Sequence, residues 1–109
     1  MYKIMLADDE GIVIDSLKFI IDKEFKDTCE VQYAKTGRSV IELAESFRPD
    51  VAVMDIQMPE MNGRDAARAI RKLDHKDAKT IPIFALSADA FVEDQRLSIA
   101  SGMNGHFSK

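Results

Sequence analysis

Five polar residues follow short apolar segments of this 109-residue chain. They supply three carboxylates, one hydroxyl and one ammonium, from Asp8, Asp9, Asp55, Ser87 and Lys109. Three clustered carboxylates repel one another, and a hard divalent cation such as Mg²⁺, which prefers oxygen ligands, relieves that repulsion. A carboxylate in such a cluster can attack a phosphorus centre while the cation and a lysine neutralise the phosphoryl oxygens. These residue types therefore indicate phosphoryl chemistry, with the hydroxyl as a further hydrogen-bond partner of those oxygens.

Each of these residues also has an ordinary structural explanation. Asp is a favoured helix N-cap, and Asp8 and Asp9 precede a helical pattern. Asp55 fits a turn residue at the start of a loop. Ser87 fits a cap of the next helix, and Lys109 fits a solvated surface lysine. Taken singly, the structural explanations are the better ones, and only the common placement of all five favours a shared site.

The segments that would position these residues alternate between two hydrophobic periods. Short apolar runs predict buried strands, and apolar residues three or four apart predict helices. The predicted strands are 3–7, 31–34, 51–54, 81–86 and 105–108, the predicted helices are 11–25, 37–47, 63–73 and 90–101, and 74–80 is a predicted polar linker. This order predicts an α/β fold with a parallel sheet and helices on both faces, in one domain.

In an open α/β sheet, ligands bind beyond the carboxyl ends of the strands. The five polar residues lie at those predicted ends. We therefore expect them to converge into one acidic pocket, with the ammonium of Lys109 opposite the carboxylates.

Composition excludes several classes of function. The net charge is −4 and there is no basic run, so direct nucleic-acid binding is not expected. No apolar run approaches the ~20 residues of a membrane span. Cys29 is the one cysteine and is expected to be a reduced thiol. These features predict a cytoplasmic protein.

On its motifs, the chain resembles response-regulator receiver domains of two-component signalling over its whole length. The matching pieces are LADDE at 6–10, VAVMDIQMPEMNG at 51–63, ALSA at 85–88 and GMNGHFSK at 102–109. The resemblance implies a doubly wound, flavodoxin-like sheet of five parallel strands in the order 2-1-3-4-5. The chain as a whole is similar to chemotaxis-type receivers. Residues 1 to about 60 look like receivers of transcription regulators, and residues from 62 onward look like receivers of hybrid sensor histidine kinases.

The resemblance implies a role for each site residue. Asp55 would accept a phosphoryl group from a phosphohistidine on a sensor histidine kinase or a histidine phosphotransfer protein. Mg²⁺ would be bound by Asp9, Asp55 and the backbone carbonyl of Gln57, and by Asp8 through water. Lys109 would contact Asp55 and the phosphoryl oxygens.

The resemblance also implies a switch. Ser87 would move toward the phosphoryl group, and His106 stands where the family has its switch aromatic. The charge change at Asp55 would then alter the surface formed by the fourth helix and the fifth strand.

Two departures from the family pattern lead to further expectations. The family's lysine is normally followed by proline and a fifth helix, whereas this chain, a receiver domain over 1–109, ends at Lys109. The C-terminal helix is thus missing, and we expect uncovered apolar sheet surface and self-association through it. A natural receiver of a hybrid kinase is the simpler explanation for the different character of the two halves. A recombined or engineered chimeric receiver fragment is the alternative, and it predicts a seam in packing around 61–65.

Two other functions compete with the phosphorylation switch. One is a receiver-like interaction module that never accepts phosphate, which has no need of the full residue set. The other is a phosphatase with an aspartyl nucleophile, which usually has a second acid two residues later, where this chain has Gln57. The sequence therefore favours a phosphoacceptor that assists its own phosphoryl transfer and hydrolysis over an enzyme with a separate substrate.

Overall fold

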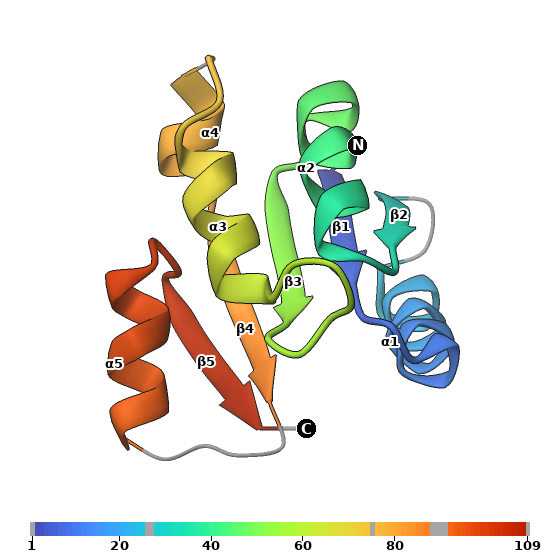
Figure 1. Ribbon diagram of the computed structural model, residues 1–109. Coiled ribbons are helices and arrows are strands. Elements are labelled where there is room, and N and C mark those ends of the chain that lie inside the picture. The colour runs from blue at the N-terminus through green and yellow to red at the C-terminus, as the bar shows by residue number, and fades with distance from the viewer. Residues whose placement is uncertain (1, 26–27, 75, 88–91, 109) are drawn as a thin grey trace.

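The computed structural model describes residues 2–25, 28–74, 76–87 and 92–108 (Figure 1). Along the chain the elements are β1 Tyr2–Ala7, α1 Gly11–Glu24, β2 Cys29–Ala34, α2 Gly37–Phe47, β3 Val51–Asp55, α3 Gly63–Arg71, α4 Lys76–Thr80, β4 Ile83–Ser87, α5 Val92–Ala100 and β5 Gly105–Ser108. Among the described helices, none combines the length and the apolar character that a membrane span needs.

The five strands form one sheet in the order β2-β1-β3-β4-β5, and every neighbouring pair is parallel. The predicted fold and strand order are therefore confirmed. β2 lies on one side of β1, and β3, β4 and β5 follow in sequence on its other side. The order reverses between β1 and β3, and the carboxyl ends of these two strands are where a doubly wound sheet binds its ligands.

One predicted element is wrong. Residues 74–80 were expected to be a polar linker, but Lys76–Thr80 forms the short helix α4. Ala78 is buried in the core, and the backbone N–H of Ile81 donates to the carbonyl of Asp77 at 2.8 Å. A single buried alanine in five residues gives no readable helical period, so the sequence pattern could not reveal this turn.

The remaining elements differ from their predictions mainly at the ends. The strand predicted over 81–86 is β4, Ile83–Ser87, and the helix predicted over 90–101 is α5, Val92–Ala100. The first two residues of that predicted helix lie outside the described residues.

The main core lies on one face of the sheet, where α2, α3, α4 and α5 pack (Figure 1). Alternate residues of the central strands point into it, and all are buried. They are Met5 and Ala7 of β1, Ala52 and Met54 of β3, and Ile83 and Ala85 of β4. The helices contribute mostly small side chains, Val40, Ala44, Ala66, Ala67, Ile70 and Ala78. These small residues let the helices lie close to the sheet, which fixes the strands that carry the predicted site.

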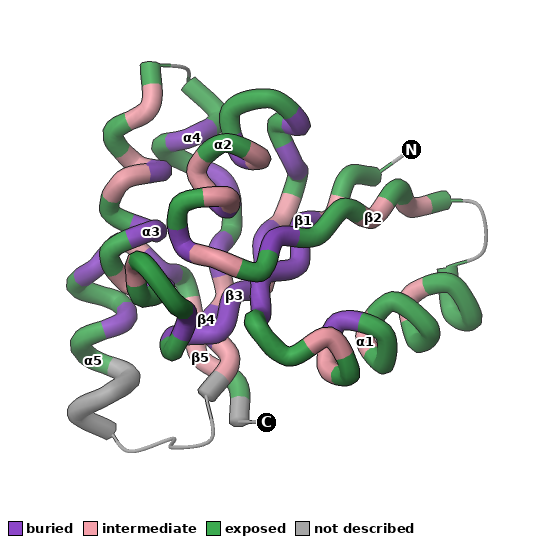
Figure 2. Tube along the Cα trace, turned by 45° about the vertical axis from the view of Figure 1, so that its right-hand side comes forward, coloured by how far each residue is buried: buried purple, intermediate pink, exposed green. Residues whose placement is uncertain are grey.

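The opposite face is covered less completely. Leu6 of β1 and Ile14 of α1 are buried there, but Val53, Phe84 and Leu86 are only partly buried. In Figure 2 most of α1 is exposed, and its exposed residues include large apolar ones. The expectation of incompletely covered apolar sheet surface is confirmed for the described residues.

The side chain of Arg71 connects α3 to α4 and to the segment before β5 through hydrogen bonds. The guanidinium of Arg71, at the end of α3, donates to the carbonyl of Gly102 at 2.7 and 3.0 Å and to the carbonyl of Ala78 at 3.1 Å. It also donates to Asn104 Oδ1 at 2.8 Å, which accepts from the N–H of Ile83 at 2.9 Å. Burial lowers the pKa of Arg71 from its usual value. This side chain joins α3, α4 and the segment before β5.

Candidate functional site

Four carboxylates meet at the carboxyl ends of β1 and β3. Asp8, Asp9, Glu10 and Asp55 each place an oxygen so that all four atoms lie within 4.8 Å of one another. Asp8 is 1% exposed and Asp55 is 5% exposed, whereas Asp9 and Glu10 are exposed. The cluster therefore has a buried floor and an open rim, as a site reached from solvent requires.

Local backbone bonds orient the two buried carboxylates. Asp8 Oδ1 accepts from the N–H of Glu10 at 2.9 Å, and Asp55 Oδ1 accepts from the N–H of Gln57 at 3.3 Å. The N-cap of α1 is Glu10, and its side chain makes no capping bond. The alternative that Asp8 or Asp9 caps this helix is therefore wrong. Asp55 does make the bond expected of a turn residue, but it also belongs to the cluster.

The loop after Asp55 is folded tightly against the site. The N–H of Gly63 donates to the carbonyl of Ile56 at 2.7 Å, and a Cβ at Gly63 would collide with the carbonyl oxygen of Asp55. A Cβ at Gly37 would likewise collide with the carbonyl of Met61. The start of α3 and the start of α2 thus both pack on this loop. Packing is continuous around 61–65, so the structure gives no support to a recombined chain.

The structure brings together only part of the predicted site. Asp8, Asp9 and Asp55 converge as expected, and Gln57 follows Asp55 in the loop. The backbone of Ser87 ends β4, one residue beyond the pairing of Asp55 with Leu86. The side chain of Ser87 and all of Lys109 lie outside the described residues, so their places in the pocket stay predictions.

His106 lies in β5, opposite Ala85 of β4. The sequence left open a surface histidine at a strand end. The structure shows a partly buried residue, whose Nδ1 lies 3.5 Å from the hydroxyl oxygen of Ser98 on α5.

Sequence reasoning missed two charged residues at the rim of the cluster. Glu10 joins it directly, and its position next to Asp8 and Asp9 was the available signal. The ammonium nitrogen of Lys35 lies 3.5 Å from where a Cβ of Gly11 would stand. Lys35 follows β2, whose end pairs with the end of β1, but a single exposed lysine gives no sequence signal of its own.

The donor set fits a hard divalent cation. All four clustered groups offer carboxylate oxygens, and Mg²⁺ takes oxygen ligands through one or two carboxylates while it keeps several waters. The two exposed acids at the rim leave room for such waters. Asp8, Asp9 and Asp55 are thus able to hold Mg²⁺.

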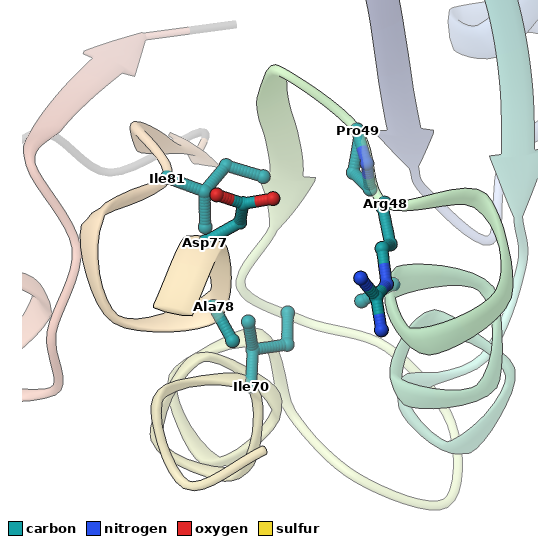
Figure 3. A pocket seen from close by; sticks show the side chains of 7 residues that line it. Arg48, Pro49, Ile70, Asp77, Ala78 and Ile81 are labelled. Atoms are coloured by element: carbon teal, nitrogen blue, oxygen red, sulfur yellow. The ribbon is translucent and has the colours of Figure 1, made fainter. Parts of the chain in front are cut away.

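Two hollows in the described part of the chain lie at the other edge of the sheet. A crevice of about 10 Å³ separates α2 from α3 and α4, and Figure 3 shows Ile70, Ala78 and Ile81 facing Arg48 and Pro49 across it. A neighbouring polar hollow of about 200 Å³ is lined partly by Asp50, whose Oδ2 accepts from the N–H of Lys3 at 2.8 Å. Asp50 is thus engaged in structure, and the carboxyl edge, where the acids converge, remains the candidate site.

Comparison with known proteins agrees with this geometry. A family model described as the response regulator receiver domain matches residues 4–109. The chain is 37% identical over 90 residues to the chemotaxis protein CheY of Thermotoga maritima, a match that covers 83% of this chain and 72% of that protein.

Two solved structures are similar over nearly the whole chain. Chemotaxis protein CheY4 of Vibrio cholerae superposes with a TM-score of 0.89 at 27% identity, covering 100% of this chain and 87% of that one. The receiver domain of the sensor histidine kinase PA1611 of Pseudomonas aeruginosa superposes with a TM-score of 0.85 at 26% identity, covering 99% and 84%. That domain has a magnesium ion coordinated in its active-site cleft.

Proposed function

Because this chain belongs to the family of response regulator receiver domains, we propose that Asp55 accepts a phosphoryl group from a phosphohistidine protein. The observation that carries the proposal is the convergence of Asp8, Asp9 and Asp55 at the ends of β1 and β3. Asp55 is buried and is the last residue of β3, so the central strand itself fixes the position of this nucleophile. A bond forms between an Asp55 oxygen and phosphorus as the bond from phosphorus to the donor's imidazole nitrogen breaks.

The other acids prepare Asp55 for this step. We assign the cation ligands to Asp9, Asp55 and the backbone carbonyl of Gln57, with Asp8 acting through water. When bound, Mg²⁺ supplies positive charge for the acids and the phosphoryl oxygens. The bond from the Gln57 N–H to Asp55 Oδ1 orients the nucleophile throughout.

Lys109 and the side chain of Ser87, which lie outside the described residues, keep the roles that the sequence predicts for them. Lys109 neutralises the phosphoryl oxygens and contacts Asp55, and the Ser87 hydroxyl donates to the same oxygens. Ser87 and His106 then pass the change to the surface of α5 and β5. The domain assists its own phosphorylation and hydrolysis and has no separate turnover substrate. It acts in the cytoplasm, where the free thiol of Cys29 stays reduced.

The phosphodonor protein has a suitable docking surface beside the acids. Ile12, Phe19 and Ile20 of α1 are large, apolar and exposed, and Ile12 lies two residues after Glu10. An exposed apolar surface of this kind marks a protein interaction site. We assign it to a sensor histidine kinase or a histidine phosphotransfer protein, which presents its phosphohistidine to the acidic pocket.

A small phosphodonor tests the chemistry without a partner. The protein is incubated with Mg²⁺ and acetyl phosphate, and its intact mass is measured. We expect a phosphoryl adduct on the wild type and on Asp15→Asn, an exposed acid of α1, but none on Asp55→Asn. A folded wild type without any adduct would establish the phosphate-independent interaction module instead. Release of phosphate over many turnovers would establish a phosphatase.

A further inference from the structure

A lysine stands at the rim of the acidic cluster. The ammonium nitrogen of Lys35 lies 3.5 Å from where a Cβ of Gly11 would stand, so it lies beside the first residue of α1. Gly11 directly follows Glu10, which is one of the clustered acids. Lys35 is exposed, and among the described residues no hydrogen bond or ion pair holds its ammonium. Its charge is therefore available to an anion that arrives from solution.

The backbone on both sides of Lys35 is fixed by the fold. Ala34 ends β2, and its carbonyl accepts from the N–H of Asp8 at 3.1 Å. Thr36 is the N-cap of α2, where its hydroxyl accepts from the N–H of Ser39 at 3.1 Å and its own N–H donates to the Ser39 hydroxyl at 3.2 Å. Lys35 thus extends from a turn that is bonded on one side to an acid of the cluster. The place of this charge follows from the sheet and the helix cap.

The electrostatics of the rim favour a cation here. A positive charge beside the first turn of a helix is unfavourable on its own, because the helix dipole is positive at that end. Four carboxylate oxygens lie next to it within 4.8 Å of one another, and their attraction offsets this cost. Arg38 of α2 differs, since its Nε lies 4.0 Å from Oε2 of Glu60 and its charge is balanced there. The charge of Lys35 therefore acts on the cluster.

An acidic pocket repels its own phosphodonor. Every phosphoryl donor is an anion, and carboxylates that bind Mg²⁺ oppose its approach to Asp55. A cation at the rim lowers this repulsion and raises the rate of encounter. The same cation repels Mg²⁺, so it weakens binding of the metal. One ammonium thus has two effects of opposite sign, and damage to the fold would not produce that pair.

We propose that Lys35 steers phosphodonors into the acidic pocket and makes the domain selective for donors of high negative charge, so that acyl phosphates serve it in addition to phosphohistidine. Lys35 is then a specificity-determining residue of the pocket. The inference rests on the proposed function, because it concerns the donor from which Asp55 takes its phosphoryl group.

Two small donors differ in the charge that Lys35 would recognise. Acetyl phosphate is a dianion near neutral pH. Phosphoramidate, in which phosphorus is bonded to nitrogen as in phosphohistidine, carries a smaller net charge because that nitrogen is protonated. As the bond from phosphorus to an Asp55 oxygen forms, the first donor releases acetate and the second releases ammonia. A charge at the rim should therefore favour acetyl phosphate over phosphoramidate.

The test compares Lys35→Gln with Lys23→Gln, because each removes one exposed lysine charge. Lys23 is in the last turn of α1, at the end opposite Gly11. Lys35→Arg keeps the charge, and Lys35→Glu reverses it. Binding of Mg²⁺ alone is measured by isothermal titration calorimetry. The rate of adduct formation is then followed by intact mass at saturating Mg²⁺, with acetyl phosphate and with phosphoramidate in separate reactions.

We expect Lys35→Gln to bind Mg²⁺ about threefold more tightly than the wild type and to react with acetyl phosphate about threefold more slowly, as loss of one charge at a solvated rim implies. Its rate with phosphoramidate should fall by a smaller factor. Lys35→Glu should enlarge each effect, whereas Lys35→Arg and Lys23→Gln should match the wild type. The differences should largely vanish near ~1 M salt, where the Debye length is about 3 Å.

Steering is overturned if Lys35→Gln and Lys23→Gln shift the Mg²⁺ affinity and the rate equally, or if Lys35→Arg loses the wild-type values. It is also overturned if both donors slow by the same factor, if Mg²⁺ affinity and rate fall together, or if the differences survive at high salt. Failure of the proposed function looks different. In that case neither donor would form an adduct on the wild type, whereas Lys35→Gln would still bind Mg²⁺ more tightly.

Discussion

The two faces of the sheet differ in how completely helices cover them. On one face, α2, α3 and α4 bury alternate residues of β1, β3 and β4, and α5 packs against β5. On the other face, α1 is the helix that provides cover within the described part of the chain. Strand residues such as Val53, Phe84 and Leu86 stay partly exposed there. Asp55 ends a strand whose inward residues are fully buried, so the covered face positions the chemistry. The less covered face contributes apolar surface instead, which suits association rather than catalysis.

The largest expected effect contrasts two neighbouring residues of β4. Ile83 is buried on the covered face, and Phe84 is partly buried on the other. Ile83→Ala should cost about 2–5 kcal/mol of unfolding free energy, the range for a cavity in a packed core. Phe84→Ala should cost less although it removes a larger side chain, because its surroundings are already partly solvated. Urea denaturation measures both, and Ile83→Val supplies a milder variant.

If the two alanine variants lose equal stability, the faces are equally packed and the comparison fails. A greater loss of unfolding free energy in Phe84→Ala than in Ile83→Ala would also contradict the comparison. It would indicate that something in solution covers the outer face.

Magnesium should stabilise the folded protein through the acidic edge. A ligand bound only by the folded state adds about 2.7 kcal/mol at a hundredfold excess over its Kd. We expect Mg²⁺ to raise the thermal midpoint of the wild type and of Asp15→Asn, and not of Asp9→Asn. An equal rise in Asp9→Asn would remove Asp9 from the ligand set. Because the acids extend from strands fixed by the covered face, Ile83→Val should weaken this response more than Phe84→Ala does.

The sequence predicted the fold well because its signals are local. Apolar runs marked every strand, and the helix predicted over 37–47 is α2, Gly37–Phe47, with the same bounds. Thr36 accepts from the N–H of Ser39 at 3.1 Å in a capping box, which gives this helix a sharp start. Asp8, Asp9 and Asp55 were placed together because parallel strands bring their carboxyl ends to one edge.

What the sequence missed depends on contacts between distant residues. Arg64 and Ser98 are 34 positions apart, and neither has a local pattern that predicts a buried polar bond. Val51 to Met54 form an apolar run without alternation, which predicts a strand covered on both faces. In the structure Val51 and Val53 are only partly buried. The hydrophobic pattern therefore predicts that both faces of a strand are apolar, and it does not predict how completely each face is buried.

The less covered face should drive self-association. Phe107 of β5 is 52% exposed and packs against Phe84 in a tilted arrangement, with ring centroids 5.3 Å apart. We expect concentration-dependent association at micromolar protein in sedimentation velocity, and Phe107→Ser should weaken it by about 1–2 kcal/mol, the worth of burying part of a large apolar side chain. Leu97→Ser is the control, since Leu97 on α5 is 51% exposed. A monodisperse wild-type monomer would contradict the expectation, as would equal weakening by both substitutions.

The smallest expected effect lies on the covered face, at the edge away from the acids. Arg48 ends α2 in the left-handed conformation, with φ at 49°, where a Cβ is unfavourable and glycine is the preferred residue. Arg48→Gly should raise the unfolding free energy by about 0.5–1 kcal/mol, since it relieves this strain. Arg48→Ala keeps the strain and loses the side chain that borders the crevice in Figure 3, so it should not stabilise. If alanine stabilises as much as glycine, the gain comes from removing the side chain and not from the backbone. Neither variant should change phosphorylation of Asp55, because the strands carry the site at their opposite ends.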